Sequence, residues 1–165
     1  MKTIKDIVKS VLEISEYPYK EEDDMLIFLV GGDNCVVDLK IHCDEEVNVL
    51  SVNGLVNMVV PKHRRTAVLA QINELNAGNT MTKFTLVMSD CRIMCRCTCN
   101  TDNGALNTKV AKLLISAVIE MLDNAYPSLL CASLGISTDM LPRDAENEGG
   151  ATATNSLIDS PMDTL

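Results

Sequence analysis

Two segments of this chain alternate apolar and polar residues, and this alternation constrains the fold more than any other feature. The first segment spans residues 35–43, the second spans residues 91–99, and the odd positions of both are apolar. These positions are Cys35, Val37, Leu39, Ile41 and Cys43, and then Cys91, Ile93, Cys95, Cys97 and Cys99. Because the side chains of a strand alternate between its two faces, each segment predicts a strand with one buried and one wet face. Such strands are typical of antiparallel sheets.

Apolar residues recur at helical spacing in three other segments, and these segments predict three helices. The first helix covers residues 4–12 and ends before Tyr17-Pro18, and the second runs from Pro61 to about residue 76. The third has its apolar stripe at residues 106–125. We expect Pro127 to close this helix, because proline disrupts a helix interior.

The other strands are predicted between turn signals. Residues 25–30 form an apolar run, and the acidic run Glu21–Asp24 before it is expected to be a solvated loop. A further strand covers residues 47–52. Asn53-Gly54 could then make a tight hairpin to a short strand at residues 55–60. We favour a loop there, because a helix begins soon afterwards.

A last strand over residues 81–89, with Phe84, Leu86 and Met88 pointing inward, precedes the second alternating segment. The predicted order of elements is therefore α-β-β-β-α-β-β-α. This order indicates an α+β fold in which helices pack on the apolar face of a five-stranded antiparallel sheet.

The periodicity is lost beyond residue 134, so we assign residues 1–134 to one domain and residues 135–165 to an acidic polar tail. The acidic residues of the tail are Asp139, Asp144, Glu146, Glu148, Asp159 and Asp163, against the single cation Arg143. We expect the tail to be flexible, because it cannot bury enough apolar surface to offset its backbone entropy. The alternative is that Leu157, Ile158, Met162 and Leu165 dock in a groove while the acids are attracted to Lys62, Arg64 and Arg65.

Charge and composition exclude several classes of function. The formal net charge is −9, which repels the phosphates of nucleic acids. With no tryptophan, three tyrosines and two phenylalanines, the chain has too few aromatic faces to stack bases. No uninterrupted apolar run approaches the ~20 residues that span a bilayer, and the N-terminus lacks a secretory pattern. We expect a cytoplasmic protein that binds neither nucleic acid nor membrane. Of the classes of ligand considered, other proteins are the most compatible with this composition.

One helix and the strand behind it resemble a known family. Residues 71–76 read Gln-Ile-Asn-Glu-Leu-Asn, and Phe84-Thr85-Leu86 follow. Over roughly residues 1–130 this pattern resembles the YbjN-type family of bacterial sensory transduction regulators, and the order of elements is that of type III secretion chaperones. The resemblance implies a shared fold, a homodimer, and apolar grooves that hold extended segments of a client protein.

The cysteines support a second hypothesis from another class of function. Four of the seven cysteines lie on residues 91–99, and no Cys-x-x-Cys pair occurs in the chain. Alternate residues of a strand lie about 6.6–6.8 Å apart, whereas two thiolates on one zinc ion approach to about 4 Å. We therefore interpret these cysteines as small buried hydrophobic residues. A thiol-dependent metal or redox sensor that uses the strand Cys91–Cys99 is the alternative.

Lys62-His63-Arg64-Arg65 is the single basic cluster of this acidic chain. Cations at the start of a helix oppose the helix dipole, so Lys62, Arg64 and Arg65 are candidate contacts for a protein partner or an anion. The sequence contains no nucleophile elbow, phosphate-binding loop, zinc-protease motif or dinucleotide fingerprint. It therefore predicts a non-enzymatic binding or regulatory protein, with no cofactor and no metal site.

Overall fold

The computed structural model describes residues 2–102 and 106–137, and the predictions for the tail beyond residue 137 lie outside the described residues. The elements follow in chain order. They are α1 (Ile4–Ile14), β1 (Lys20–Glu22), β2 (Met25–Gly31), β3 (Val36–Asp44), β4 (Val49–Val59), the 3-10 helix η1 (Lys62–Arg64), α2 (Arg65–Ala77), β5 (Lys83–Leu86), β6 (Arg92–Asn100) and α3 (Thr108–Leu134).

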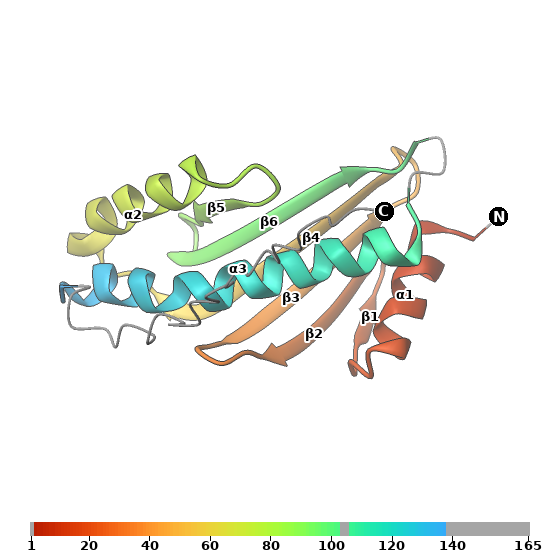
Figure 1. Cartoon of the computed structure of the whole chain (residues 1–165), viewed down its shortest axis with the longest axis horizontal. Coiled ribbons are helices and arrows are strands. Elements are labelled where there is room, and N and C mark those ends of the chain that lie inside the picture. The colour runs from red at the N-terminus through yellow and green to blue at the C-terminus, as the bar shows by residue number, and fades with distance from the viewer. Residues whose placement is uncertain (1, 103–105, 138–165) are drawn as a thin grey trace, which may run out of the picture.

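The strands form one antiparallel sheet in the order β1-β2-β3-β4-β6-β5. The predicted α+β class is confirmed, but the described sheet has six strands, whereas five were predicted. The helices pack on one face, where α3 crosses the sheet obliquely between α1 and α2 (Figure 1). The alternation predicted for β3 and β6 is also confirmed, because Leu39, Ile41, Cys95 and Cys97 are buried against the helices.

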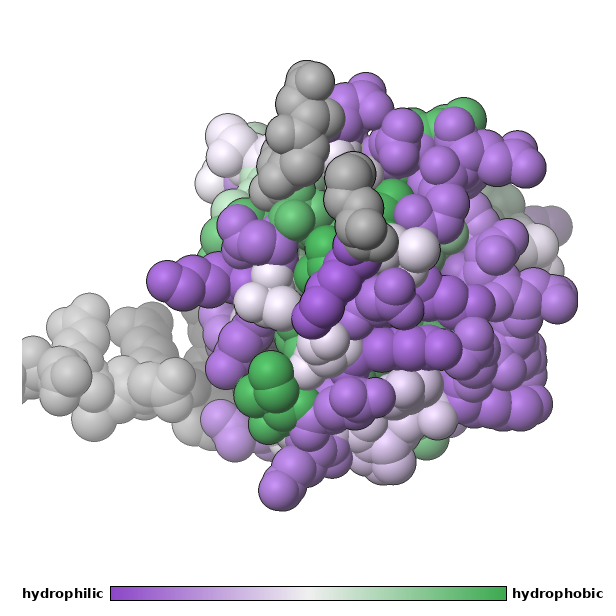
Figure 2. Space-filling view, turned by 90° about the vertical axis from the view of Figure 1, so that its right-hand side faces the viewer, coloured by the Kyte–Doolittle hydropathy of each residue, from purple (hydrophilic) through white to green (hydrophobic). Residues whose placement is uncertain are grey.

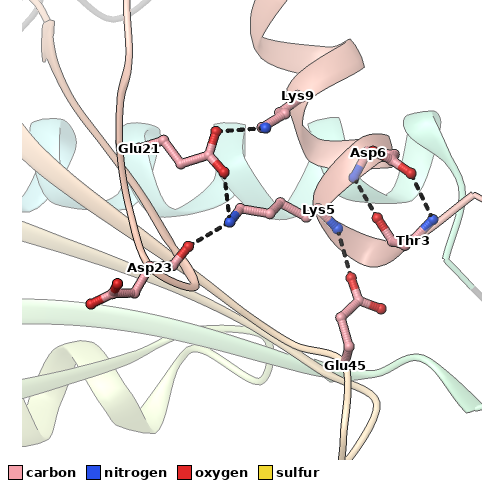
Figure 3. Close-up of polar contacts among 7 residues, drawn as sticks. All are labelled: Thr3, Lys5, Asp6, Lys9, Glu21, Asp23 and Glu45. Atoms are coloured by element: carbon pink, nitrogen blue, oxygen red, sulfur yellow. Dashed lines mark hydrogen bonds and ion pairs between the residues drawn. The ribbon is translucent and has the colours of Figure 1, made fainter.

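The strand missed by the sequence prediction is β1, which contains part of the acidic run that was expected to be a solvated loop. Glu21 of β1 faces the helical side and pairs with Lys5 and Lys9 of α1 at 2.7 and 2.6 Å (Figure 3). Lys5 also bonds to the carbonyl oxygen of Asp23 and, through its backbone N–H, to Glu45 at 3.0 Å. The acids at this end therefore attach α1 to two turns of the sheet, which explains why a charged segment forms a strand.

The sequence Asn53-Gly54 forms neither a loop nor a hairpin, because β4 continues straight through it. Gly54 faces α3, and a Cβ atom there would lie 2.6 Å from Leu122 and 2.7 Å from Val118. The glycine thus allows α3 to approach the sheet closely, which is one of the reasons for glycine inside a strand. The predicted loop was wrong because the glycine serves a contact between elements and not a turn.

Helix α3 does not end at Pro127 but continues to Leu134. Proline lacks the N–H of an intrahelical bond and costs about 3 kcal/mol inside a helix. Leu129 and Cys131, beyond the proline, are buried, and burying one such side chain contributes ~1.5–3 kcal/mol. The helix ends at Gly135, whose φ of 77° and N–H bond to the carbonyl of Cys131 form a left-handed cap.

Strand β5 ends at Leu86, so the prediction that Met88 points inward is wrong. Met88 is 63% exposed, because the chain leaves the sheet in a turn closed by the N–H of Cys91 on the carbonyl of Val87. Phe84 and Leu86 are buried as predicted.

Among the described helices only α3 is long and apolar enough to cross a membrane by length and composition. Here it packs against the sheet and both other long helices, and ten of its residues are buried.

Candidate partner-binding surface

A pocket of about 420 Å³ opens beside the C-terminal half of α3. Its lining is almost entirely apolar and consists of Asn34, Tyr126, Pro127, Leu130, Cys131, Leu134 and Ile136. Leu134 and Ile136 are 60% and 44% exposed, so two large aliphatic side chains stand at the pocket in contact with water. Concave apolar surface of this kind is a common feature of binding sites.

Asp123 of α3 holds the β2–β3 turn, and with it Asn34, against the pocket. Its Oδ1 accepts hydrogen bonds from the backbone N–H groups of Asn34 and Cys35 at 2.8 and 2.9 Å, and its Oδ2 accepts from Asp33 at 3.0 Å. Gly32 leaves room for this carboxylate, since a Cβ atom there would lie 2.2 Å from Oδ1. The turn is therefore fixed on α3 by one side chain.

The same three hydrogen bonds determine the charge state of this carboxylate. Burial raises the pKa of Asp123, but the backbone N–H groups of Asn34, Cys35 and Asp33 together lower it further than burial raises it. The pKa of the group therefore lies below its ordinary value, and at neutral pH the turn is held by an anion.

The three predicted contact residues do not form one cluster. Lys62 is exposed on η1 and has no partner among the described residues. Arg64 caps the end of α3, donating from Nε and Nη2 to the carbonyl of Ala132 at 3.0 and 2.9 Å. Arg65 donates from Nη2 to the sulfur of Cys91 at 2.7 Å, and its buried Nε has no partner in the described part of the chain.

This arrangement still places positive charge near the pocket. The guanidinium group of Arg64 lies about 2.9 Å from where a Cβ atom on Gly135 would be, and Gly135 separates the two exposed pocket residues. A cation here also complements the negative end of the α3 dipole. Of the three candidates, only Lys62 keeps its charged group free of the described residues.

The face of the sheet opposite the helices is the second open surface. Leu29, Val36 and Val59 project from it and are 64%, 56% and 64% exposed. The strand register places Lys40, Asn53, Arg96 and Lys83 in one row across β3, β4, β6 and β5. We call Lys40, Arg96 and Lys83 the cationic row.

The end of the molecule that bears α1 is different. Figure 2 shows that this end is largely hydrophilic, with hydrophobic side chains in small separate patches. The acidic segments 21–24 and 44–46 lie in strand ends and turns attached to α1. Binding through apolar contacts is therefore favoured at the α3 pocket and not here.

The cysteines of β6 lie mainly inside the protein. Burial raises the pKa of Cys95 to about 11 and also raises the pKa of Cys97, so both thiols are protonated at neutral pH. Cys91, which lies in the turn before β6, and Cys99 are only half-buried, so the prediction of buried cysteines holds for Cys95 and Cys97 and is wrong for these two. In residues 2–102 and 106–137, no group of three or more His, Cys, Asp or Glu side chains is placed to hold a metal ion.

The pocket and the cationic row were both missed by the sequence prediction. Asn34 and α3 are far apart in the chain, and the prediction closed α3 at Pro127, before most of the pocket residues. The wet face of residues 35–43 contains Lys40, but only the strand register shows which residues of other strands lie beside it. An apolar repeat past Pro127, at Leu130 and Leu134, was the available signal for the pocket.

Comparison with known proteins shows the family. The YbjN family model, described as "Putative bacterial sensory transduction regulator", matches residues 5–130. The chain belongs to the YbjN family. The resemblance stated from the sequence is thereby confirmed. No curated protein matches the sequence of this chain.

Two solved structures share the fold. The crystal structure of YbjN from E. coli has a TM-score of 0.61 at 16% identity and covers 79% of this chain and 93% of its own. The HopA1–SchA chaperone–effector complex contains a chain with a TM-score of 0.53 at 14% identity, covering 73% of this chain and 90% of its own. At these identities the likeness concerns the fold alone.

Proposed function

We propose that this YbjN-family chain is a non-enzymatic protein-binding module, chaperone-like or regulatory, that holds a segment of a protein partner in the α3 pocket. The observation that carries the proposal is the pocket itself, which has an apolar lining and two exposed aliphatic residues, Leu134 and Ile136. Exposed aliphatic side chains beside a concave apolar surface gain free energy when a partner covers them.

The comparisons support a role in holding other proteins. A chain of similar fold occurs in the HopA1–SchA chaperone–effector complex, so this fold is compatible with binding another protein. Lys62, exposed on η1 near the same end of α3, would meet an acidic group of the partner. Arg64 and Arg65 would contribute mainly through long-range attraction, because their guanidinium groups already bond within the domain.

The test is affinity purification of the tagged full chain from its native host, followed by quantitative mass spectrometry. The pocket variant combines Leu134→Asp with Ile136→Asp, which place two charges at the pocket. The matched control is Leu113→Asp, because Leu113 lies on the same helix, is 55% exposed and does not line the pocket. Circular dichroism would check that all three proteins fold.

We expect at least one protein to be enriched with the wild type and with Leu113→Asp, and to be strongly depleted with the pocket variant. Equal enrichment with all three proteins would contradict the assignment of the pocket. If the wild type enriches nothing above an untagged control, the protein-binding function itself is wrong.

The thiol-dependent alternative has one observation in its favour, the contact between Arg65 and the half-buried Cys91. Against it, the raised pKa values of Cys95 and Cys97 leave both thiols in the unreactive protonated form. Thiol labelling of the native protein separates the two functions. Slow labelling of all seven cysteines is expected of the binding module, and rapid, selective labelling among Cys91, Cys95, Cys97 and Cys99 would favour the sensor.

A further inference from the structure

The outward positions of β4, β6 and β5 contain no acidic residue, although the whole chain has a net charge of −9. These positions carry three cations, Arg92, Arg96 and Lys83. Lys40 of β3 extends the positive surface by one strand through its register with Asn53. One half of the open sheet face is therefore positive in an otherwise acidic protein.

The charges of this surface are only partly compensated within the domain. Arg96 donates from Nε to Asn53 at 2.6 Å, and its Nη groups have no partner among the described residues. The amine of Lys83 lies 2.9 Å from the carbonyl of Asn79, a contact that leaves its charge in place. Arg92 pairs with Asp90 at 2.7 Å. The amine of Lys40 makes no ion pair or hydrogen bond in the described part of the chain, although its charge contributes to the lowered pKa of Glu22.

The acidic tail begins at the same end of the molecule. The described chain stops at Ser137, two residues after Gly135, which lies against Arg64. Arg64 and Lys62 belong to η1, which directly follows β4, and the end of β4 pairs with Arg92. Basic residues thus lead from the place where the tail starts to the outward side of β6.

The length of the tail allows it to follow this path. Residues 138–148 span up to roughly 36 Å when extended, and they contain Asp139, Asp144, Glu146 and Glu148. Neighbouring strands lie about 4.8 Å apart, so the path from η1 to β5 is well within reach. Tethering also keeps the local concentration of the acids high.

We propose that the acidic segment 139–148 docks on the outward face of β6 and β5, against Arg92, Arg96 and Lys83, and so shields the open face of the sheet. The contact is electrostatic, because this segment has few apolar side chains to bury. It is independent of the α3 pocket. A second copy of the domain is disfavoured as the occupant, since two positive faces repel each other.

The test is zero-length carbodiimide cross-linking of the full chain, which joins lysine amines to carboxylates in direct contact. Mass spectrometry then locates the linked residues. We expect links from the tail acids to Lys83, and to Lys62 along the path. The controls are Lys109 and Lys112, which are exposed in the first turns of α3. Links from the tail to these two lysines measure chance contacts. Raising the salt to ~1 M shortens the Debye length to about 3 Å and should remove the specific links.

The deciding variant is Arg92→Gln with Arg96→Gln, because arginine is not itself linked by carbodiimide. The links to Lys83 should fall severalfold in this variant and stay unchanged in Lys109→Gln with Lys112→Gln, which loses the same charge. An unchanged yield at Lys83 in the arginine variant would overturn the proposal. So would equal linking of the tail to Lys83 and Lys112. Links that join isotopically light and heavy chains in a mixed sample would assign the contact to a second copy and also overturn it.

Discussion

Replacing Asp123 by Asn should destabilise the protein more than any other single charge-neutralising change on α3. The residue is 8% exposed and accepts three backbone hydrogen bonds within 3.0 Å from the β2–β3 turn. An asparagine can keep its oxygen on two of these N–H groups, but its NH2 group then faces the third. Because both of these groups are hydrogen-bond donors, they cannot bond to each other, and the backbone N–H of Asp33 loses its acceptor.

The magnitude follows from the burial of the three donors. Hydrogen bonds to a charged group contribute about 1.5–3 kcal/mol each, and an unsatisfied buried donor costs about 1–3 kcal/mol. Asp33 and Asn34 are exposed and can bond to water, whereas Cys35 is half-buried. We therefore expect Asp123→Asn to lower the free energy of unfolding by roughly 2–3 kcal/mol, and Asp123→Ala by somewhat more, because it also leaves Cys35 unpaired.

Urea unfolding followed by circular dichroism measures this change at fixed protein concentration. With a slope of about 2 kcal/mol per molar urea, the midpoint should fall by roughly 1–1.5 M. The control is Glu120→Gln, which removes one charge from the same helix at an exposed position without a partner among the described residues. Its effect should stay within about 0.5 kcal/mol.

The difference between wild type and Asp123→Asn should also depend on pH. Because the folded-state pKa lies below the ordinary value of 3.8, the anion contributes its full stability above about pH 4. This contribution is lost as the pH falls through the folded-state pKa. The gap between the two proteins should therefore be constant from neutral pH to about pH 5 and shrink below pH 3.8. Equal midpoints for Asp123→Asn and Glu120→Gln, or a gap that widens in acid, would refute this reasoning.

Four further predictions concern single residues and assembly. Gly54→Ala should destabilise by about 1–3 kcal/mol through overpacking against α3, whereas Gly31→Ala, with nothing within 4 Å of its Cβ position, should be nearly neutral in the same urea assay. Cys97→Ser should cost roughly 1–3 kcal/mol, since it buries a hydroxyl group, and stoichiometric zinc in wild-type protein purified without chelator would argue for the sensor instead. Arg64→Ala should lower stability by about 1–2 kcal/mol by removing the cap on Ala132, with Arg64→Lys rescuing only part of the loss. Light scattering should show a homodimer of twice the 18.0 kDa chain mass, and a concentration-independent monomer would exclude it.

The parts of the fold predicted correctly from the sequence are those in which one face of an element is buried along its length. In β3 and β6 every second residue is buried or half-buried on the side of the helices, so the period of the apolar residues is visible without knowledge of the partners. Helix α1 begins at Ile4, where its helical spacing predicts, and there Thr3 and Asp6 bond to each other's backbone N–H groups at 3.0 and 3.1 Å (Figure 3). These signals are local, and local signals can be found in one sequence.

The errors arose where a contact between distant segments overrides a local preference. A charged strand such as β1 has no apolar period, and the salt bridges of Glu21 to Lys5 and Lys9 that join it to the preceding helix form only when the chain folds back on α1. The candidate pocket was missed for the same reason, since Asn34 and Tyr126 meet only after the whole sheet has formed. Of the predicted contact residues, Lys62 is exposed at the surface, and its contact with a partner stays a prediction. The hydrogen bonds that Arg64 and Arg65 make within the domain could not be inferred from a sequence segment of consecutive basic residues.

The departures from local rules lie on α3 and on the strand that it covers, and this concentration supports a role for the end of α3. Gly54 of β4 lies under Val118 and Leu122 of α3, the adjacent Asp123 holds the β2–β3 turn, and Pro127, about one helical turn further on, lines the pocket. Each feature costs local stability, through backbone entropy, a desolvated charge or a lost hydrogen bond. Together they bring the helix close to the sheet, fix the β2–β3 turn on it and let it continue to Leu134, beside which the pocket opens. Sequences tend to break local rules at functional or strained sites, so the succession of these features along α3 is a physical reason to look for the partner there.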